Sequence, residues 1–220
     1  MKLAYPLLDR PIEFAEGTVN VLVLENAVEL RKAVLSLKRQ ADGEPGEFVL
    51  SEEHEPKEFS KLAALVTDPF SLELSSKKIS TKLTQEASRT ARELDDDLRR
   101  IMSDINSLAA KISALMEFET VFTELEGADA LIKMLDFCID EAELSFPEAI
   151  LEYMKLQRVF FNKKLFVFYN LKACLSETEL SLLYRSACYE KYAVLLVEDR
   201  QRSALPEEKT VVVDNDLCVF

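Results

Sequence analysis

The sequence predicts an α/β domain that is interrupted by a long helical insertion. Short apolar runs of strand length occur in residues 1–75 and again in residues 162–220. Residues 81–125 contain neither Gly nor Pro, which is typical of a long, uninterrupted helix. In the last third, a strand pattern, a capped helix pattern and a second strand pattern follow one another, and this order favours a parallel βαβ unit.

Composition limits the class of protein. The chain has 220 residues, of which 48% are hydrophobic and 30% are charged, so it is long enough and apolar enough to fold around a core. No apolar run approaches the roughly 20 residues of a membrane helix, and the N-terminal residues lack a signal-peptide core. The four cysteines are widely spread and His54 is the single histidine, so a zinc site is not expected. We expect a cytoplasmic protein with free thiols and no membrane partner.

The first part of the chain reads as strands around one helix. The apolar run Val19–Leu24 predicts a strand, and Asn26 predicts the N-cap of the helix that follows it. Residues 40–46 contain two glycines and a proline and predict a loop. Further short strands are predicted at Phe48–Leu50, Ala63–Val66 and Ser71–Leu74.

The helical insertion carries an apolar seam of coiled-coil type. Eight apolar residues are separated by alternating steps of three and four: Ala91, Leu94, Leu98, Ile101, Ile105, Leu108, Ile112 and Leu115. A single helix over residues 81–125 would be roughly 65 Å long, so it should project from the α/β domain. The next two seam positions are Glu119 and Glu126, which predict a change of environment at the end of the helix.

Two returning helices and a second group of strands complete the prediction. The helices are expected at Ala128–Ile139 and Phe146–Phe161, where they can bury the seam of the long helix. The chain then re-enters a sheet, with strands at Leu165–Asn170, Ala193–Val197 and Val211–Val213 and a helix from Ser176 to Lys191. The predicted domains are an α/β head of residues 1–75 and 162–220, and a helical leg of residues 76–161.

Basic residues gather in stretches that contain no acid, although the net charge is −13. Three such stretches are residues 30–41, 74–85 and 153–176. The acidic total argues against a nucleic-acid partner, and each stretch alone could be a solvated face, but three such stretches in an acidic protein are harder to dismiss. The second stretch contains Lys77, Lys78 and Lys82, and the third contains Lys155, Arg158, Lys163, Lys164 and Lys172.

The residues required for nucleotide hydrolysis are missing. None of the four glycines lies in a GxxxxGK[ST] loop, which needs glycine so that backbone N–H groups can surround phosphates. The first predicted strand runs directly into Glu25 and Asn26, and a carboxylate there would repel phosphate. Asn170 ends a strand at which a magnesium-binding acid would be expected. His54 lies in a polar loop and does not suggest a nucleophilic triad. We therefore expect neither nucleotide hydrolysis nor catalysis by a histidine-based triad.

Acidic residues gather at the end of the long helix. A hard cation such as Ca²⁺ binds six to eight oxygens, several of them from carboxylates. The candidate ligands are Glu117, Glu119, Glu124, Glu126, Asp129 and Glu148, and the alternative is a solvated helix end. A nuclease built on carboxylates and a metal remains an alternative function at this point.

Four short motifs appear in the order seen in one known family. These are LLDRPI from Leu7, VTD from Val66, KKLFVFYN from Lys163 and LLVEDR from Leu195. With the length and the helical insertion, they make the chain resemble the small ring-forming adaptation proteins of type II-A CRISPR systems. The resemblance extends over essentially the whole chain.

The resemblance implies a fold and a function. It implies an α/β head similar to P-loop NTPases but without a nucleotide site, and a homotetrameric ring with a basic hole. Such a ring binds ends of double-stranded DNA during spacer acquisition, together with the CRISPR integrase complex and the effector nuclease. With this implied function, the candidate DNA contacts are Lys77, Lys78, Lys82, Lys155, Arg158, Lys163 and Lys164. Calcium is implied as a structural ion, and no catalysis is implied. The alternatives are a coiled-coil scaffold that does not bind DNA and a metal-dependent nuclease.

Overall fold

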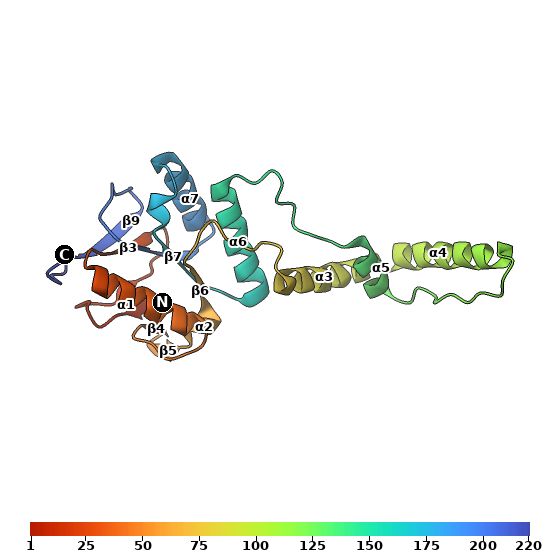
Figure 1. Ribbon diagram of the computed structural model, residues 1–220, viewed down its shortest axis with the longest axis horizontal. Helices are drawn as coiled ribbons and strands as arrows, with labels where there is room; N and C mark the ends of the chain where they lie inside the picture. Colours follow the sequence, from red (N-terminus) through yellow and green to blue (C-terminus); the bar gives the residue numbers. More distant parts are fainter. The chain divides into compact units, whose positions relative to one another are not determined.

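The computed structural model describes residues 1–220 and divides them into two compact units (Figure 1). The head comprises Met1–Leu74 and Glu141–Phe220, and the leg unit comprises Ser75–Asp140. The predicted leg of residues 76–161 is therefore too long. Its last helix, α6 (Phe146–Phe161), belongs to the head, because Ile150 and Met154 are completely buried in the core of that unit. No helix is both long and apolar enough to cross a membrane.

The head is built on a five-stranded sheet in which all pairs are parallel, in the order β6-β7-β8-β3-β9. The strands are β3 (Val19–Leu24), β6 (Ala63–Val66), β7 (Leu165–Tyr169), β8 (Ala193–Glu198) and β9 (Glu208–Val213). Helix α7 (Glu177–Tyr189) connects β7 to its neighbour β8, which confirms the predicted parallel βαβ unit. The α/β fold class predicted from the sequence is thus confirmed.

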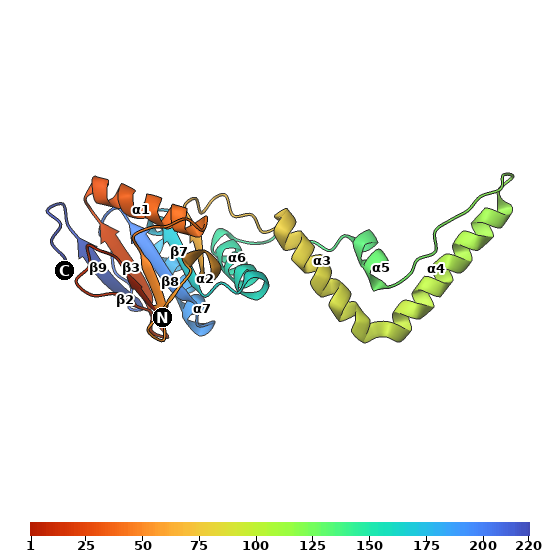
Figure 2. The same cartoon turned by 90° about the horizontal axis from the view of Figure 1, so that it is seen from below.

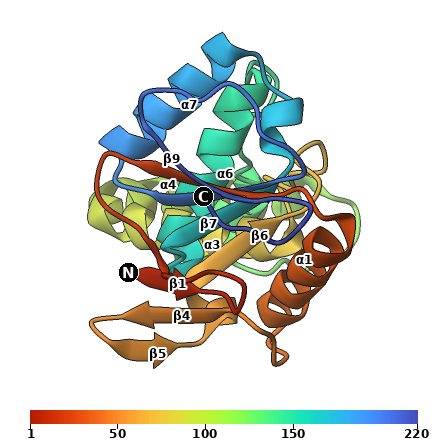
Figure 3. The same ribbon diagram turned by 90° about the vertical axis from the view of Figure 1, so that its left-hand side faces the viewer.

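Helices cover both faces of this sheet, as Figure 3 shows. Side chains alternate along each strand, so Val21 and Val23 face α6 and α7, whereas Leu22 and Leu24 face α1 (Ala27–Ala41). All six residues of β3 are buried. Strands buried on both faces are expected to be apolar throughout, which is why these strands were visible in the sequence.

A small antiparallel sheet, in the order β2-β1-β4-β5, packs on the α1 side. Its strands are β1 (Lys2–Ala4), β2 (Ile12–Glu13), β4 (Val49–Glu52) and β5 (Glu55–Lys57), and the short helix α2 (Phe59–Leu62) follows. The sequence predicted β4 in part and missed the others, because strands of two or three residues carry no clear alternation. The predicted strand at Ser71–Leu74 is wrong, since these residues have no strand pairing.

Residues 214–220 fold back along β9, which is an edge strand of the large sheet. Val212 and Phe220 exchange both backbone hydrogen bonds, at 2.9 and 3.1 Å, and Val213 bridges Val219. The side chain of Asp214 holds the turn by accepting from the backbone N–H groups of Asp216 and Cys218. The tail therefore covers the outer side of β9.

The leg unit consists of two helices that meet at an angle, with a third helix within the bend (Figure 2). These are α3 (Lys77–Ala91), α4 (Asp95–Leu115) and α5 (Ala128–Leu135), and the 3₁₀ turn η1 (Arg92–Leu94) joins the first two. The predicted single helix of residues 81–125 is wrong. The break lies where Asp95, Asp96 and Asp97 fill the first turn of α4, a position that favours carboxylates because of the helix dipole.

The predicted seam is buried only in its first part. Ala91 and Leu98 pack against Leu131 and Ile132 of α5, so a returning helix does cover this end. Beyond Leu98 the seam is largely uncovered within the chain. Leu94, in the turn between α3 and α4, is exposed as well. The exposed large apolar residues beyond Leu98 are Ile101, Leu108, Ile112, Leu115, Met116, Phe118, Val121 and Phe122.

Residues 116–127, between α4 and α5, are not helical and return alongside α4. The amide of Asn106 accepts from the backbone N–H of Leu125 at 2.9 Å and donates to its carbonyl at 3.3 Å. The Ser113 and Thr120 hydroxyls are 2.7 Å apart, within hydrogen-bond distance. Glu119 and Glu126 therefore do not occupy positions on a helical seam, contrary to the prediction.

Candidate functional site

The junction between β3 and α1 has no room for a phosphate-binding loop. Only Glu25 and Asn26 separate the strand from the helix. The Asn26 side chain accepts from the backbone N–H groups of Val28 and Glu29, at 3.0 and 3.3 Å. These donors at the helix N-terminus are the ones that a nucleotide phosphate would use. The carboxyl end of β3 is thus closed by the N-cap of the helix that follows it.

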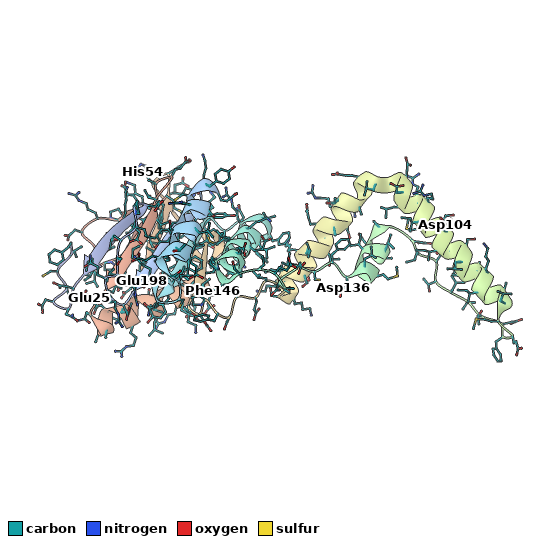
Figure 4. The ribbon with its side chains drawn as sticks, turned by 90° about the horizontal axis from the view of Figure 1, so that it is seen from above. Glu25, His54, Asp104, Asp136, Phe146 and Glu198 are labelled. Atoms are coloured by element: carbon teal, nitrogen blue, oxygen red, sulfur yellow. The ribbon has the colours of Figure 1, made fainter.

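The polar residues at the ends of β7 and β8 are bound to one another within the head. Asn170 follows β7 and accepts from the backbone N–H of Asp199 at 3.1 Å. Glu198 ends β8 and is completely buried; Figure 4 shows it inside the head. It accepts from the backbone N–H of Lys172 at 3.0 Å and from Arg202 at 2.6 Å. Burial raises the pKa of the Glu198 carboxyl, although the Lys172 N–H and the charge of Arg202 oppose this rise.

A buried ion pair lies beside Glu198. Lys172 Nζ is 2.7 Å from Glu208, and the two side chains are 4% and 1% exposed. The same Nζ donates to the carbonyl of Ser203 at 2.8 Å, and the Tyr184 hydroxyl donates to Glu208 at 2.9 Å. In the sequence, Lys172 lies in the basic stretch of residues 153–176, which contains no acid, and nothing in that stretch indicates Glu208 as its partner. The pair is part of the core and is not available to a ligand.

The six predicted metal ligands do not form a site within one chain. No group of three or more His, Cys, Asp or Glu side chains is placed so that it could hold a metal ion. The four glutamates from Glu117 to Glu126 are exposed on the returning segment of the leg unit. Asp129 lies 4.0 Å from Arg92. Glu148 closes the capping box of α6, where it accepts from the backbone N–H of Ser145 at 2.8 Å.

The predicted basic residues of the head already have partners in the head. Lys155 is 3.3 Å from Glu152. Arg158 donates to the carbonyl of Glu190 at 2.6 Å and lies over the Tyr192 ring, 5.2 Å from its centroid. Lys163 donates to the carbonyl of Ser60, and Lys164 is 2.8 Å from Glu52. Arg158, Lys163 and Lys164 thus link α6 and the start of β7 to other parts of the head, whereas Lys155 is paired only within α6. A DNA phosphate would have to compete with these contacts.

The predicted basic residues of the leg unit are different. Lys77, Lys78 and Lys82 lie in the first two turns of α3 and are exposed. None of the three takes part in an ion pair within the chain, and the first turn of α3 contains no acid. Three unpaired cations on two helical turns form a suitable surface for phosphate groups. They are the strongest candidates for nucleic-acid contacts among the residues that the sequence suggested.

The parallel five-stranded sheet and the helical insertion define an α/β protein in which the usual phosphate-binding position after β3 is closed. Comparison with protein-family models gives one match, described as CRISPR-associated protein (Cas_Csn2), over residues 40–217. The chain belongs to this family of type II-A CRISPR-associated proteins, which confirms the resemblance seen in its sequence. Its role is therefore CRISPR-associated.

Comparison with solved structures gives weak matches to two ATP-binding cassettes of ABC transporters. The first, in its ADP conformation, has a TM-score of 0.48 and 16% identity over 97% of this chain and 85% of that chain. The second is nucleotide-free and has a TM-score of 0.47 and 16% identity over 96% of this chain and 83% of that chain. Comparison with curated protein sequences gives no match.

Proposed function

We propose that this protein binds ends of double-stranded DNA, independently of sequence, as a homotetrameric ring that acts in CRISPR spacer acquisition. The observation that carries the proposal is the unpaired cluster of Lys77, Lys78 and Lys82 in a chain of net charge −13. Contacts to phosphates carry no sequence information, so such a cluster favours binding without sequence preference. The partners are the DNA end, the CRISPR integrase complex and the effector nuclease.

The exposed apolar side chains of the leg unit support assembly. Leu115, the last residue of the seam, is 86% exposed, and Val121, which lies beyond the seam, is 99% exposed. Contiguous apolar surface of this kind usually contacts another protein. In our proposal it contacts further copies of the same chain and closes the ring.

Calcium enters the proposal as an ion of the assembly. The carboxylates of residues 117–126 are of the oxygen type that Ca²⁺ prefers, but one chain does not gather enough of them. A site would therefore need oxygens from more than one chain. In that case the ion would stabilise the ring rather than the fold of the single chain.

The test is an electrophoretic shift assay with one duplex in linear and in covalently closed circular form, in calcium and in chelator. We expect binding of the linear form only, since a closed circle cannot enter a ring, and stronger binding in calcium. Light scattering on the same samples should give a tetramer mass that is more stable with calcium. Equal binding of both forms, or a monomer in both conditions, would contradict the ring.

The proposal includes the absence of nucleotide chemistry. Asn26 occupies the helix N-terminal donors, and Glu198 is engaged by Lys172 and Arg202. We expect isothermal calorimetry with ATP and Mg²⁺ to give no binding heat up to millimolar nucleotide, and no phosphate release. A micromolar affinity for ATP would overturn this part of the proposal.

The structure offers less support to the two alternative functions. A metal-dependent nuclease needs its carboxylates side by side, and the six acidic candidates are not gathered in the chain. A scaffold without DNA binding would use the exposed apolar residues but leaves the lysine cluster of α3 without a role. If the duplex stays intact after incubation with Mg²⁺ or Mn²⁺, the nuclease is excluded. If the protein binds DNA in a salt-dependent way, the scaffold without DNA binding is excluded.

A further inference from the structure

Hydrogen-bond donors continue along α3 well beyond the three lysines. Five exposed polar residues on this helix and the turn after it are separated by steps of four, three, four and three: Lys78, Lys82, Gln85, Arg89 and Arg92. Residues with this spacing share one face of a helix. Over 14 residues this row is about 21 Å long, which corresponds to about six nucleotides of one strand along the duplex axis.

The second half of the row borders a groove between α3 and α5. The groove has a volume of about 610 Å³ and lies entirely within the leg unit. Its lining includes Gln85, Ser88, Arg89 and Arg92 from the α3 side and Lys133 from α5. The one carboxylate in the lining is Asp129.

The arginines of the groove are paired only with carboxylates that are themselves exposed. Arg92 and Asp129 are 4.0 Å apart, and both side chains are more than 60% exposed, at 71% and 62%. Arg89 is paired with Glu86 on its own helix at the surface. Exposed pairs of this kind contribute little to stability, so they do not explain why the cations lie here.

The charge pattern of the leg unit separates α3 from α4. Residues 77–92 contain five cations and one acid, whereas residues 93–97 contain four acids and no cation. The break at η1 turns the chain between these two segments (Figure 2). Asp95 and Asp97 pair with Arg99 and Arg100 of the next turn, so the start of α4 carries no net positive charge and a polyanion is attracted mainly along α3.

We propose that the α3–α5 groove, with Gln85, Arg89, Arg92 and Lys133, is a binding site for the sugar-phosphate backbone of DNA, continuous with Lys78 and Lys82. This inference rests on the proposed function and extends it to Arg89, Arg92 and Lys133, which lie outside the basic stretches of the sequence. The donors are of the types that contact phosphates, and the groove gives them a concave surface. Asp129 opposes binding, because it adds a negative charge beside the phosphates and attracts Arg92.

The test compares two charge-matched triple variants by titration of linear duplex at several salt concentrations. R89Q/R92Q/K133Q removes the cations of the groove, and R99Q/R100Q/K111Q removes two arginines and a lysine from exposed positions on α4. We expect the groove variant to bind about tenfold more weakly, with the salt slope flatter by about 0.9 for each phosphate that it no longer neutralises. The α4 variant should bind as the parent does.

A third variant, D129N, tests the groove without removing a cation, because it removes the one negative charge of the lining. It should bind linear duplex severalfold more tightly than the parent, with the same oligomeric mass by light scattering. If the parent binds DNA but the groove variant matches the α4 variant and D129N changes nothing, the groove proposal is wrong and the groove is free for a protein partner. If the parent itself binds no DNA, the proposed function fails.

Discussion

Replacing Lys77, Lys78 and Lys82 together by glutamine should lower the affinity for linear duplex by at least about tenfold at low salt and flatten its salt dependence. Each phosphate contact contributes roughly −0.9 to the slope of log affinity against log salt, so one or two contacts in each of four subunits give about −4 to −7 for the parent. The reduction should be equal for all DNA sequences. Titrations across a several-fold range of salt concentration measure both quantities.

The matched control is K2Q/K57Q/K61Q. These lysines of the head are paired with Glu13, Glu55 and Glu58, at 2.6, 2.7 and 2.8 Å. The control removes the same charge and should bind DNA nearly as the parent does. A second variant that neutralises the head residues Lys155, Arg158, Lys163 and Lys164 should have the smaller effect, because their partners are in the head. If both the α3 variant and this head variant bind as tightly as the parent, the proposed DNA surface is wrong.

Replacing Lys172 by methionine should destabilise the head by about 3–5 kcal/mol, because Glu208 then remains as a buried charge without its partner. Adding E208Q should restore most of this stability, since the introduced amide oxygen can still accept from the Tyr184 hydroxyl. The measurement is urea unfolding followed by far-UV circular dichroism, as the chain has no tryptophan.

The control for this experiment is K155M, which removes a lysine that is 64% exposed. A surface ion pair of this kind should change the free energy of unfolding by less than about 0.5 kcal/mol. If K172M were as stable as K155M, the buried pair would not stabilise the head. If E208Q did not compensate for K172M, the cost would come from poorer packing rather than from the unpaired charge.

The sequence predicted those elements whose apolar pattern is complete. Strands β6 and β7 lie where they were expected, because their burial is close to continuous. Helix α6 lies where it was expected because it opens with a capping box and a proline in its first turn. The break between α3 and α4 was missed because the apolar spacing runs through it, from Ala91 across Leu94 to Leu98. The acidic run after Leu94 was the signal for a new helix start.

The candidate site was predictable only in its composition. Lys163 and Lys164 bind partners 103 and 112 residues away, at Ser60 and Glu52, and no local pattern shows contacts over such separations. Lys77, Lys78 and Lys82 look the same as the head lysines in the sequence, but their side chains are exposed and unpaired. The extension of the row to Arg89 and Arg92 could have been found from its spacing, which the sequence contains.

The tail of residues 214–220, which pairs with β9, also protects the chain against edge-to-edge pairing of strands from different molecules. The strand it covers ends in Thr210, Val211, Val212 and Val213, a run with strong β-propensity and no charge. An open strand edge of this composition is a template for pairing with an identical strand of another molecule. Residues 214–220 occupy that edge, so their removal would favour irregular aggregates over any ordered assembly built through the leg units.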